Sequence, residues 1–170
     1  MTTLASPQIT LRAASAGDVE DIAGLWHSGW IDGHLGHVPE SFHPHRRLDD
    51  FRERVPSRIA RTTVATIDSR VVGFVTLHDD ELEQIYVAAP ARGGGVADAL
   101  LRHAEQAIAA RYDRAWLAVA VGNARARRFY ARQGWTDAAA IDYEAEIAGG
   151  TLTVACRRYE KRLADQPSTD

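Results

Sequence analysis

The sequence is poor in the residues on which thiol and lysine chemistry depend. Cysteine occurs once among the 170 residues, as Cys156, so neither an internal disulfide nor a Cys-x-x-Cys redox or zinc motif can form. Lysine also occurs once, as Lys161 near the C-terminus, which argues against a Gly-Lys-Ser/Thr phosphate loop and against a buried Schiff-base lysine. These absences disfavour kinase-type and P-loop functions.

Long apolar runs and an excess of positive charge are also missing. No stretch approaches the roughly 18–20 uninterrupted apolar residues of a membrane span, and residues 1–7 lack the basic end and apolar stretch of a signal peptide. The formal net charge is −3 and the pI is about 6.2, so no global field attracts nucleic acid. We expect a cytoplasmic protein whose partners include neither nucleic acid nor a membrane.

What is present is ordinary for a globular protein. Apolar residues make up 45% of the chain and charged residues 25%, which excludes disordered, collagen-like and disulfide-scaffold classes. A chain of 170 residues has the length of one domain. We predict a single domain over residues 1–163 and a polar C-terminal tail over residues 164–170.

Periodicity predicts the order of the elements. Strands are expected at residues 9–13, 62–67, 71–77, 82–87, 115–119, 137–147 and 151–158, from alternation or β-branched content. Helices are expected at about residues 19–33, 48–59, 96–107 and 123–133. Pro56 marks a kink or break in the second of these helices. The order is β-α-α-β-β-β-α-β-α-β-β, with a parallel crossover between residues 82 and 119.

The turn before the third predicted helix is the most informative segment. Gly93, Gly94 and Gly95 are consecutive, which permits a tight turn and lets backbone N–H groups approach an anion at a helix N-terminus. A flexible connection that binds nothing is the alternative. A dinucleotide fingerprint, G-x-G-x-x-G in an N-terminal βαβ unit, does not fit, because Asp98 occupies the third glycine position and the unit is central.

These residues resemble the GNAT superfamily of acetyl-CoA-dependent N-acyltransferases. R-G-G-G-V-A at residues 92–97 fits the family signature [Q/R]-x-x-G-x-[G/A], and N-x-x-A-x-x-F-Y-x-x-x-G-W at residues 123–135 is similar to a later family segment. Residues 82–87, residues 98–101 and the pair Arg12 and Asp18 extend the resemblance over about residues 9–162. It implies an α+β fold with a mixed, mostly antiparallel sheet of six to seven strands flanked by about four helices.

The resemblance implies acetyl-CoA as cosubstrate. The central strand would splay from its neighbour after Val87, whose backbone would bind the pantetheine arm, while amides of the glycine loop would hold the pyrophosphate. Asn123 would contact the pantetheine or order its loop. The alternative is that Asn123 simply caps the N-terminus of the following helix. The implied cofactor-binding residues are Ile85, Tyr86, Val87, Arg92, Gly93, Gly94, Gly95, Val96, Ala97, Asp98, Asn123, Arg125 and Tyr130.

Three residues are candidates for catalysis. Tyr130 matches the family tyrosine that protonates the leaving thiolate, with packing beside Phe129 as the alternative. Some family members use a glutamate of the central strand as the base, and Glu81 and Glu83 are the aligned options. Alternation places both on the face of Val87 unless a bulge intervenes. Deprotonation through water and an exposed acidic turn with no role both remain open.

The region of residues 34–45 holds four of the seven histidines and lies where the family places a variable acceptor loop. The histidine spacings match no zinc pattern, so we expect no metal. Trp26, Trp30, His34 and Phe42 are the candidate acceptor-binding residues of a partly aromatic pocket. The alternative is that these are merely loop residues.

The resulting prediction is an N-acetyltransferase that moves an acetyl group from acetyl-CoA to a primary amine of a small molecule or peptide, by direct attack in a ternary complex. The contrasting prediction is a non-catalytic acyl-CoA sensor or interaction module on the same fold. A nucleotide-dependent oxidoreductase is disfavoured by the missing fingerprint. Homodimers are common in the family, although nothing in this sequence requires one.

Overall fold

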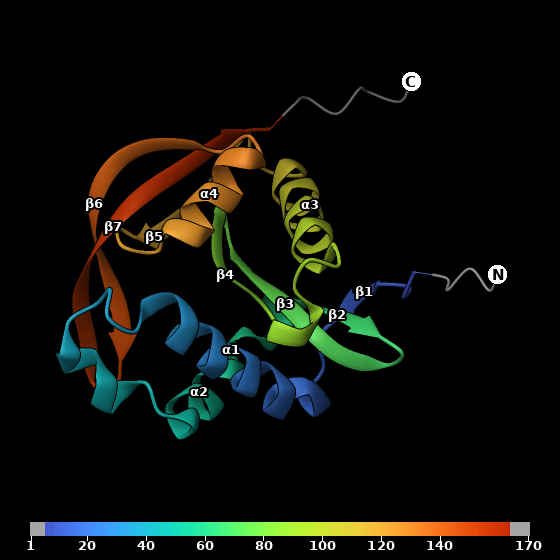
Figure 1. Cartoon of the computed structure of the whole chain (residues 1–170), viewed down its shortest axis with the longest axis horizontal. Coiled ribbons are helices and arrows are strands. Elements are labelled where there is room, and N and C mark those ends of the chain that lie inside the picture. The colour runs from blue at the N-terminus through green and yellow to red at the C-terminus, as the bar shows by residue number, and fades with distance from the viewer. Residues whose placement is uncertain (1–5, 164–170) are drawn as a thin grey trace.

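One seven-stranded sheet organises the computed structural model, which describes residues 6–163 (Figure 1). The strands are β1 (Thr10–Ala13), β2 (Thr62–Ile67), β3 (Arg70–His78), β4 (Glu81–Val87), β5 (Arg114–Ala120), β6 (Thr136–Ile147) and β7 (Gly150–Arg162). Their spatial order is β1-β2-β3-β4-β5-β7-β6. Every neighbouring pair is antiparallel except β4 and β5, which are parallel. The predicted mixed, mostly antiparallel sheet and its parallel crossover are confirmed.

Four α-helices flank this sheet in the described part of the chain. They are α1 (Val19–His34), α2 (Leu48–Arg54), α3 (Val96–Ala109) and α4 (Ala124–Arg132). Short 3-10 helices add η1 (Ala16–Asp18), η2 (Glu40–His45), η3 (Val55–Arg61) and η4 (Ala89–Ala91). The break expected at Pro56 is real, because α2 ends at Arg54 and η3 continues the chain. The predicted tail, residues 164–170, and residues 1–5 lie outside the described residues.

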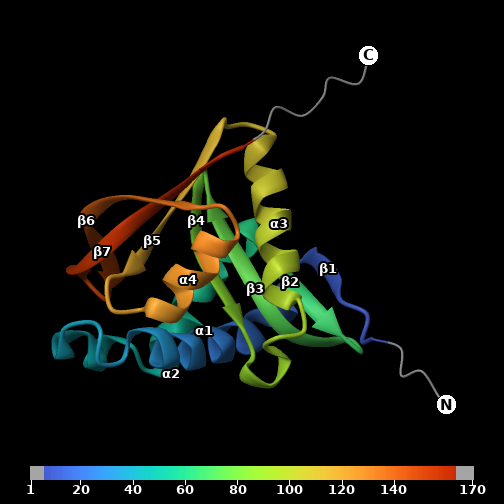
Figure 2. The ribbon, with the colours of Figure 1, turned by 45° about the horizontal axis from the view of Figure 1, so that its top comes forward.

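Two apolar cores lie on the two faces of the sheet. Neighbouring strand residues alternate between them: Phe74 packs with α1 and α2, whereas Val75 packs with α3. The expected apolar stripe of α1, which includes Ile22, Trp26 and Trp30, is buried in the same core as Phe74. The molecule is therefore a three-layer arrangement with α1 and α2 on one face and α3 and α4 on the other (Figure 2). Across residues 6–163, no helix combines the length and apolarity that crossing a membrane requires.

Candidate functional site

The sheet opens between β4 and β5. The only paired residues of these two strands are Glu81 and Trp116, supported by the Trp116 N–H, which donates to the Asp80 carbonyl over 3.1 Å. Beyond that point β5 follows β7, with which it pairs along its whole length, while β4 stays on β3. Parting after Val87 was therefore a wrong prediction, because the strands part at the start of β4. Figure 2 shows α4 beside the opening.

Two cavities meet at this opening. The larger one has a volume of about 430 Å³ and lies toward α1, η3 and β6, whereas the smaller one has about 270 Å³ and lies between α1, β4 and α4. Both are lined by the same five residues, namely Ile85, Tyr86, Asn123, Ala126 and Tyr130. Two ligands could therefore reach each other beside Tyr130 from different sides.

The smaller cavity collects most of the residues expected to bind the cofactor. Besides the shared residues, its walls include Val87, Arg92, Ala97 and Arg125. Arg132, which sequence reasoning missed, adds a third guanidinium. Cations near a helix N-terminus suit a phosphate-bearing ligand.

The glycine loop borders this cavity without lining it. Gly93 and Gly95 have φ of +79° and +88°, which side-chain-bearing residues rarely adopt, and Gly95 caps α3. The next N–H groups lack a carbonyl one turn earlier in the helix. The side chains of Val96 and Asp98 have other roles, since Val96 is buried in the core and Asp98 accepts a hydrogen bond from Gln133. Gly94 and these neighbours could serve an anion only through the backbone.

Two glycines of α1, which sequence reasoning also missed, set how closely this helix approaches the site. A Cβ atom at Gly29 would lie 2.0 Å from the ring of Tyr86, and one at Gly33 would lie 2.9 Å from the amide nitrogen of Asn123. Both glycines line the smaller cavity. Their spacing of four residues on an amphipathic helix was the available sequence signal. Asn123 itself is the N-cap of α4, since its side chain accepts from the Ala126 N–H over 3.2 Å.

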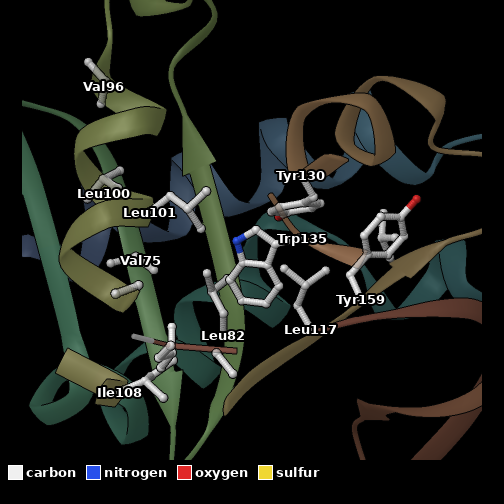
Figure 3. Packing of buried hydrophobic residues seen from close by; sticks show 14 of the residues in the cluster. Val75, Leu82, Val96, Leu100, Leu101, Ile108, Leu117, Tyr130, Trp135 and Tyr159 are labelled. Carbon is white, nitrogen blue, oxygen red and sulfur yellow. The ribbon is translucent and has the colours of Figure 1, made fainter. Parts of the chain in front are cut away.

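Tyr130 lies at the junction of the two cavities. Figure 3 shows its ring beside Trp135 and Tyr159, whose ring centroids are each 6.1 Å from its own. Within the described residues no hydrogen bond reaches its hydroxyl, and burial raises the pKa of this phenol above its usual range. The hydroxyl therefore keeps its proton at neutral pH and is free to donate it to a ligand.

A bulge in β4 decides where the two glutamates point. Thr76 pairs with Gln84 and Leu77 with Leu82, which leaves Glu83 as the extra residue. Both glutamates consequently line the larger cavity on the α1 side, whereas Val87 packs with the α3-side core. Alternation would have put Glu81, Glu83 and Val87 on one face, and the bulge is the exception under which we expected it to fail.

The two glutamates differ in their partners. Glu83 is bound by Arg58 over 2.8 Å and by Arg61, and these hydrogen bonds and charges hold the pKa of its carboxyl below the usual value despite burial. Within residues 6–163 Glu81 makes no ion pair with an arginine or lysine, and it accepts one hydrogen bond from the Tyr143 hydroxyl over 2.8 Å. Burial raises its pKa, and nearby Glu83 adds to the increase. Glu81 is therefore the better proton acceptor of the two.

The expected acceptor residues all line the larger cavity, namely Trp26, Trp30, His34 and Phe42. His34 stacks on Trp30 with an interplanar angle of 5°. Burial lowers the pKa of His34 to about 4, and Arg46 adds to the effect, so the ring is neutral at pH 7. Of the four histidines in residues 34–45, only His34 is in the cavity wall. Over residues 6–163, no three His, Cys, Asp or Glu side chains come together as a metal site.

The largest feature missed from the sequence is a group of four arginines in the wall of the larger cavity. Its members are Arg46, Arg54, Arg58 and Arg61. Three of them recur at spacings of four and three residues, which places side chains on one side of a helical segment. That spacing was visible, but whether it faced solvent or a cavity was not.

Solved structures define the class to which this fold belongs. One similar chain is the PaiA N-acetyltransferase of Thermoplasma acidophilum with coenzyme A, at 20% identity and a TM-score of 0.70, over 91% of this chain and 99% of that one. Another is YncA, a putative acetyltransferase of Salmonella typhimurium with acetyl-CoA, at 16% identity and a TM-score of 0.68, over 96% of this chain and 98% of that one. A third is spermidine N-acetyltransferase of Vibrio cholerae with CoA and spermine, at 24% identity and a TM-score of 0.65, over 92% of this chain and 96% of that one. At these identities the likeness shows the fold, that of GNAT acetyltransferases.

The family follows from the sequence match. The model of the acetyltransferase (GNAT) family matches residues 25–135, and the chain belongs to this family. No curated protein sequence matches the chain at a significant level. The resemblance expected from residues 92–97 and 123–135 is thus confirmed at the level of the family.

Proposed function

We propose that the protein transfers an acetyl group from acetyl-CoA to a primary amine of a small molecule or peptide by direct attack in a ternary complex. The observation that carries the proposal is the meeting of the two cavities at Tyr130. Acetyl-CoA would occupy the smaller cavity, with its pyrophosphate at the glycine loop and at Arg92, Arg125 and Arg132. The acceptor would occupy the larger one, so that its amine meets the thioester beside β4. Neighbours with bound CoA or acetyl-CoA support this use of the fold.

Glu81 and Tyr130 would move the protons. The amine attacks the thioester carbon, Glu81 takes up a proton from the attacking nitrogen, the carbon–sulfur bond breaks, and Tyr130 donates a proton to the departing thiolate. A carboxyl with a raised pKa binds that proton better than an ordinary one, provided that it is ionised at the start. Glu83, held by Arg58 and Arg61, would remain an ion-paired spectator that shapes the wall.

Cys156 supports direct transfer rather than an acetyl-enzyme. It lies in β7 in the wall of the larger cavity, and burial raises the pKa of its thiol to about 11. The nucleophilic thiolate is therefore scarce at pH 7. Initial-rate kinetics should give intersecting double-reciprocal lines, whereas parallel lines or an acetylated Cys156 isolated without acceptor would contradict the ternary complex.

The deciding experiment compares two glutamate variants over a pH range. Activity is measured as thiol release from acetyl-CoA with a weakly basic amine, so that ionisation of the acceptor does not mask that of the enzyme. Wild-type kcat/KM should fall as the pH decreases through the pKa of Glu81, because the base is lost on protonation. Glu81→Gln should lower kcat by on the order of 10²-fold and flatten this limb.

Glu83→Gln is the matched variant. It leaves two arginines without their carboxylate and should cost on the order of 3 kcal/mol of unfolding free energy while keeping the limb. If Glu81→Gln retains the wild-type rate and profile, Glu81 is not the base. If no amine in a broad panel is acetylated, although acetyl-CoA binds, the protein is an acyl-CoA sensor.

A further inference from the structure

The four arginines of the larger cavity fall into two pairs with different partners. Arg58 and Arg61 bind Glu83, and Arg58 also binds Glu146 over 2.8 Å. Arg46 donates to the carbonyls of His45 and Glu146 over 3.0 and 2.8 Å and makes no ion pair within residues 6–163. The guanidinium of Arg54 has neither a hydrogen bond nor an ion pair in the described part of the chain. Two cations in the cavity wall therefore lack an anionic partner in contact.

Both cations are also withdrawn from solvent. Arg46 is 8% exposed and Arg54 9%. Burial and, to a smaller extent, the positive charge of Arg54 lower the pKa of Arg46 to about 10. Asp50 and Glu146 act on both arginines and Glu53 on Arg54, but only at longer range. A buried charge without a partner is costly, and an anionic ligand in the cavity would offset this cost.

The other acidic side chains of the wall are already engaged. Glu144 accepts hydrogen bonds from Thr151 and Thr153 over 2.8 and 2.6 Å. Glu81 is bound by Tyr143 at the edge of the cavity where β4 and β5 part. The wall thus presents the carboxylate of Glu81 at the start of β4 and two unpaired guanidiniums on the segments around α2. This polarity suits a molecule with an amine at one end and an anion at the other.

We infer that the acceptor carries a carboxylate or another small anionic group besides its amine, and that Arg54 and Arg46 bind this group. The inference rests on the proposed function and names the substrate class of the same cavity. A volume of about 430 Å³ admits a molecule of amino-acid to dipeptide size. A polyamine such as the spermine bound by the Vibrio cholerae neighbour would instead add positive charge beside the guanidiniums.

The test compares amines that carry an anionic group with neutral partners, and adds one polyamine. The probes are glycine, alanine, leucine and phenylalanine against their primary amides, O-phosphoethanolamine against ethanolamine, and spermidine. Thiol release gives kcat/KM, corrected for the fraction of free amine. The anionic member of at least one pair should be preferred by about tenfold or more, because a fork of charge-assisted hydrogen bonds is lost with the neutral member. The amino acid pairs and the phosphate pair tell which anion the site takes.

Arg54→Gln tests the residue. It should abolish the preference by raising KM for the anionic probe, while the neutral amide and the affinity for acetyl-CoA stay unchanged. The melting temperature of the ligand-free variant should not fall, since an unpaired buried cation is removed, and a loss of stability would mark Arg54 as structural and overturn its role. Arg52→Gln is the matched control, because Arg52 lies in the same helix but pairs with Glu20 and Asp49 at the surface.

The remaining outcomes separate this inference from the proposed function. If kcat/KM for the amides or spermidine equals or exceeds that for the anionic probes, the inference is overturned, whereas the proposed acetyltransferase activity is supported. If no probe is acetylated, melting temperatures with CoA plus N-acetyl amino acids or N-acetyl amino amides replace the rates. If the N-acetyl amino acids raise the melting temperature, the amides do not, and Arg54→Gln abolishes the increase, anion binding is supported although the proposed function fails. If acids and amides have the same effect, the inference is overturned. If Arg54→Gln does not fold, Arg54→Lys should retain a weakened preference, and an unchanged one overturns the assignment.

Discussion

Tyr130 is buried and yet lines both cavities, and we expect this combination to give its hydroxyl the chemical role proposed above. Its ring packs among Trp135, Tyr159 and Phe129, so the phenol cannot turn away from the junction of the two cavities. The same burial raises its pKa and keeps the proton in place. The expected alternative, packing beside Phe129, is observed, and the proposed proton transfer would depend on that packing.

Tyr130→Phe keeps the ring and removes the hydroxyl. We expect kcat to fall by on the order of 10²-fold, because the thiolate loses its proton donor, while the affinity for acetyl-CoA changes little. Thiol-release kinetics and calorimetric titration measure the two quantities. Tyr112→Phe, at a partly buried ring outside both cavities, is the control. Wild-type kcat in Tyr130→Phe across the pH range would leave Tyr130 with a packing role alone.

At the scale of elements, the contact between α1 and β4 decides the shape of the site. The helix approaches the strand closely enough for Gly29 to touch the ring of Tyr86, a residue shared by both cavities. A larger residue would move the helix, the ring or both. The distance between these elements is therefore set by a hydrogen atom in place of a methyl group.

Gly29→Ala and Gly24→Ala form a matched pair within α1. The first places a Cβ atom 2.0 Å from Tyr86 and should cost about 1–3 kcal/mol by overpacking. The second meets nothing within 4 Å and should stabilise the helix by about 0.5–1 kcal/mol. Thermal unfolding should therefore shift in opposite directions, by about 2–4 °C per kcal/mol. A higher melting temperature in Gly29→Ala would contradict the close approach of α1 and β4.

The turn into α3 offers a second test at this scale. Gly95→Val forces a branched side chain into a positive φ at the first amides of the helix, and we expect it to weaken acetyl-CoA binding by about tenfold or more. Gly149→Val introduces the same strain at φ +79° in the β6–β7 turn, away from both cavities, and should leave affinity unchanged. Titration calorimetry compares the two. Unchanged affinity in Gly95→Val counts against the glycine loop as the pyrophosphate site.

At the scale of the whole molecule, a ligand in the opening would hold both halves of the sheet. The smaller cavity is lined by α1 and β4 on one side of the gap and by α4 on the other. A bound ligand would therefore contact elements on both sides of a gap that β4 and β5 bridge through a single residue pair. Binding should therefore stabilise the fold as a unit. Figure 1 shows β6 and β7 extending away from β4 on the far side of this gap.

Acetyl-CoA at 100 times its Kd should add about 2.7 kcal/mol to the unfolding free energy. The melting temperature should rise by about 5–10 °C for a chain of this length. Scanning fluorimetry measures the shift, and NAD at equal concentration should produce none. A shift with NAD but not with acetyl-CoA would restore the oxidoreductase reading and reject the acetyl-CoA site.

The order of the elements, the amphipathic stripe of α1, the glycine loop and the position of Tyr130 could all be read from the sequence, because each depends on residues close together in the chain. The site depended on contacts that local periodicity does not contain. The bulge at Glu83, which turns the glutamates away from the face of Val87, arises from the register of β4 against β3. The different chemistry of Glu81 and Glu83 follows from Arg58, Arg61 and Tyr143, which lie between 22 and 62 residues away from the glutamate that each contacts. Arg46 and Arg54 line a cavity beside β4 because the sheet parts where β5 turns to follow β7. Only long-range strand pairing decides where the sheet parts.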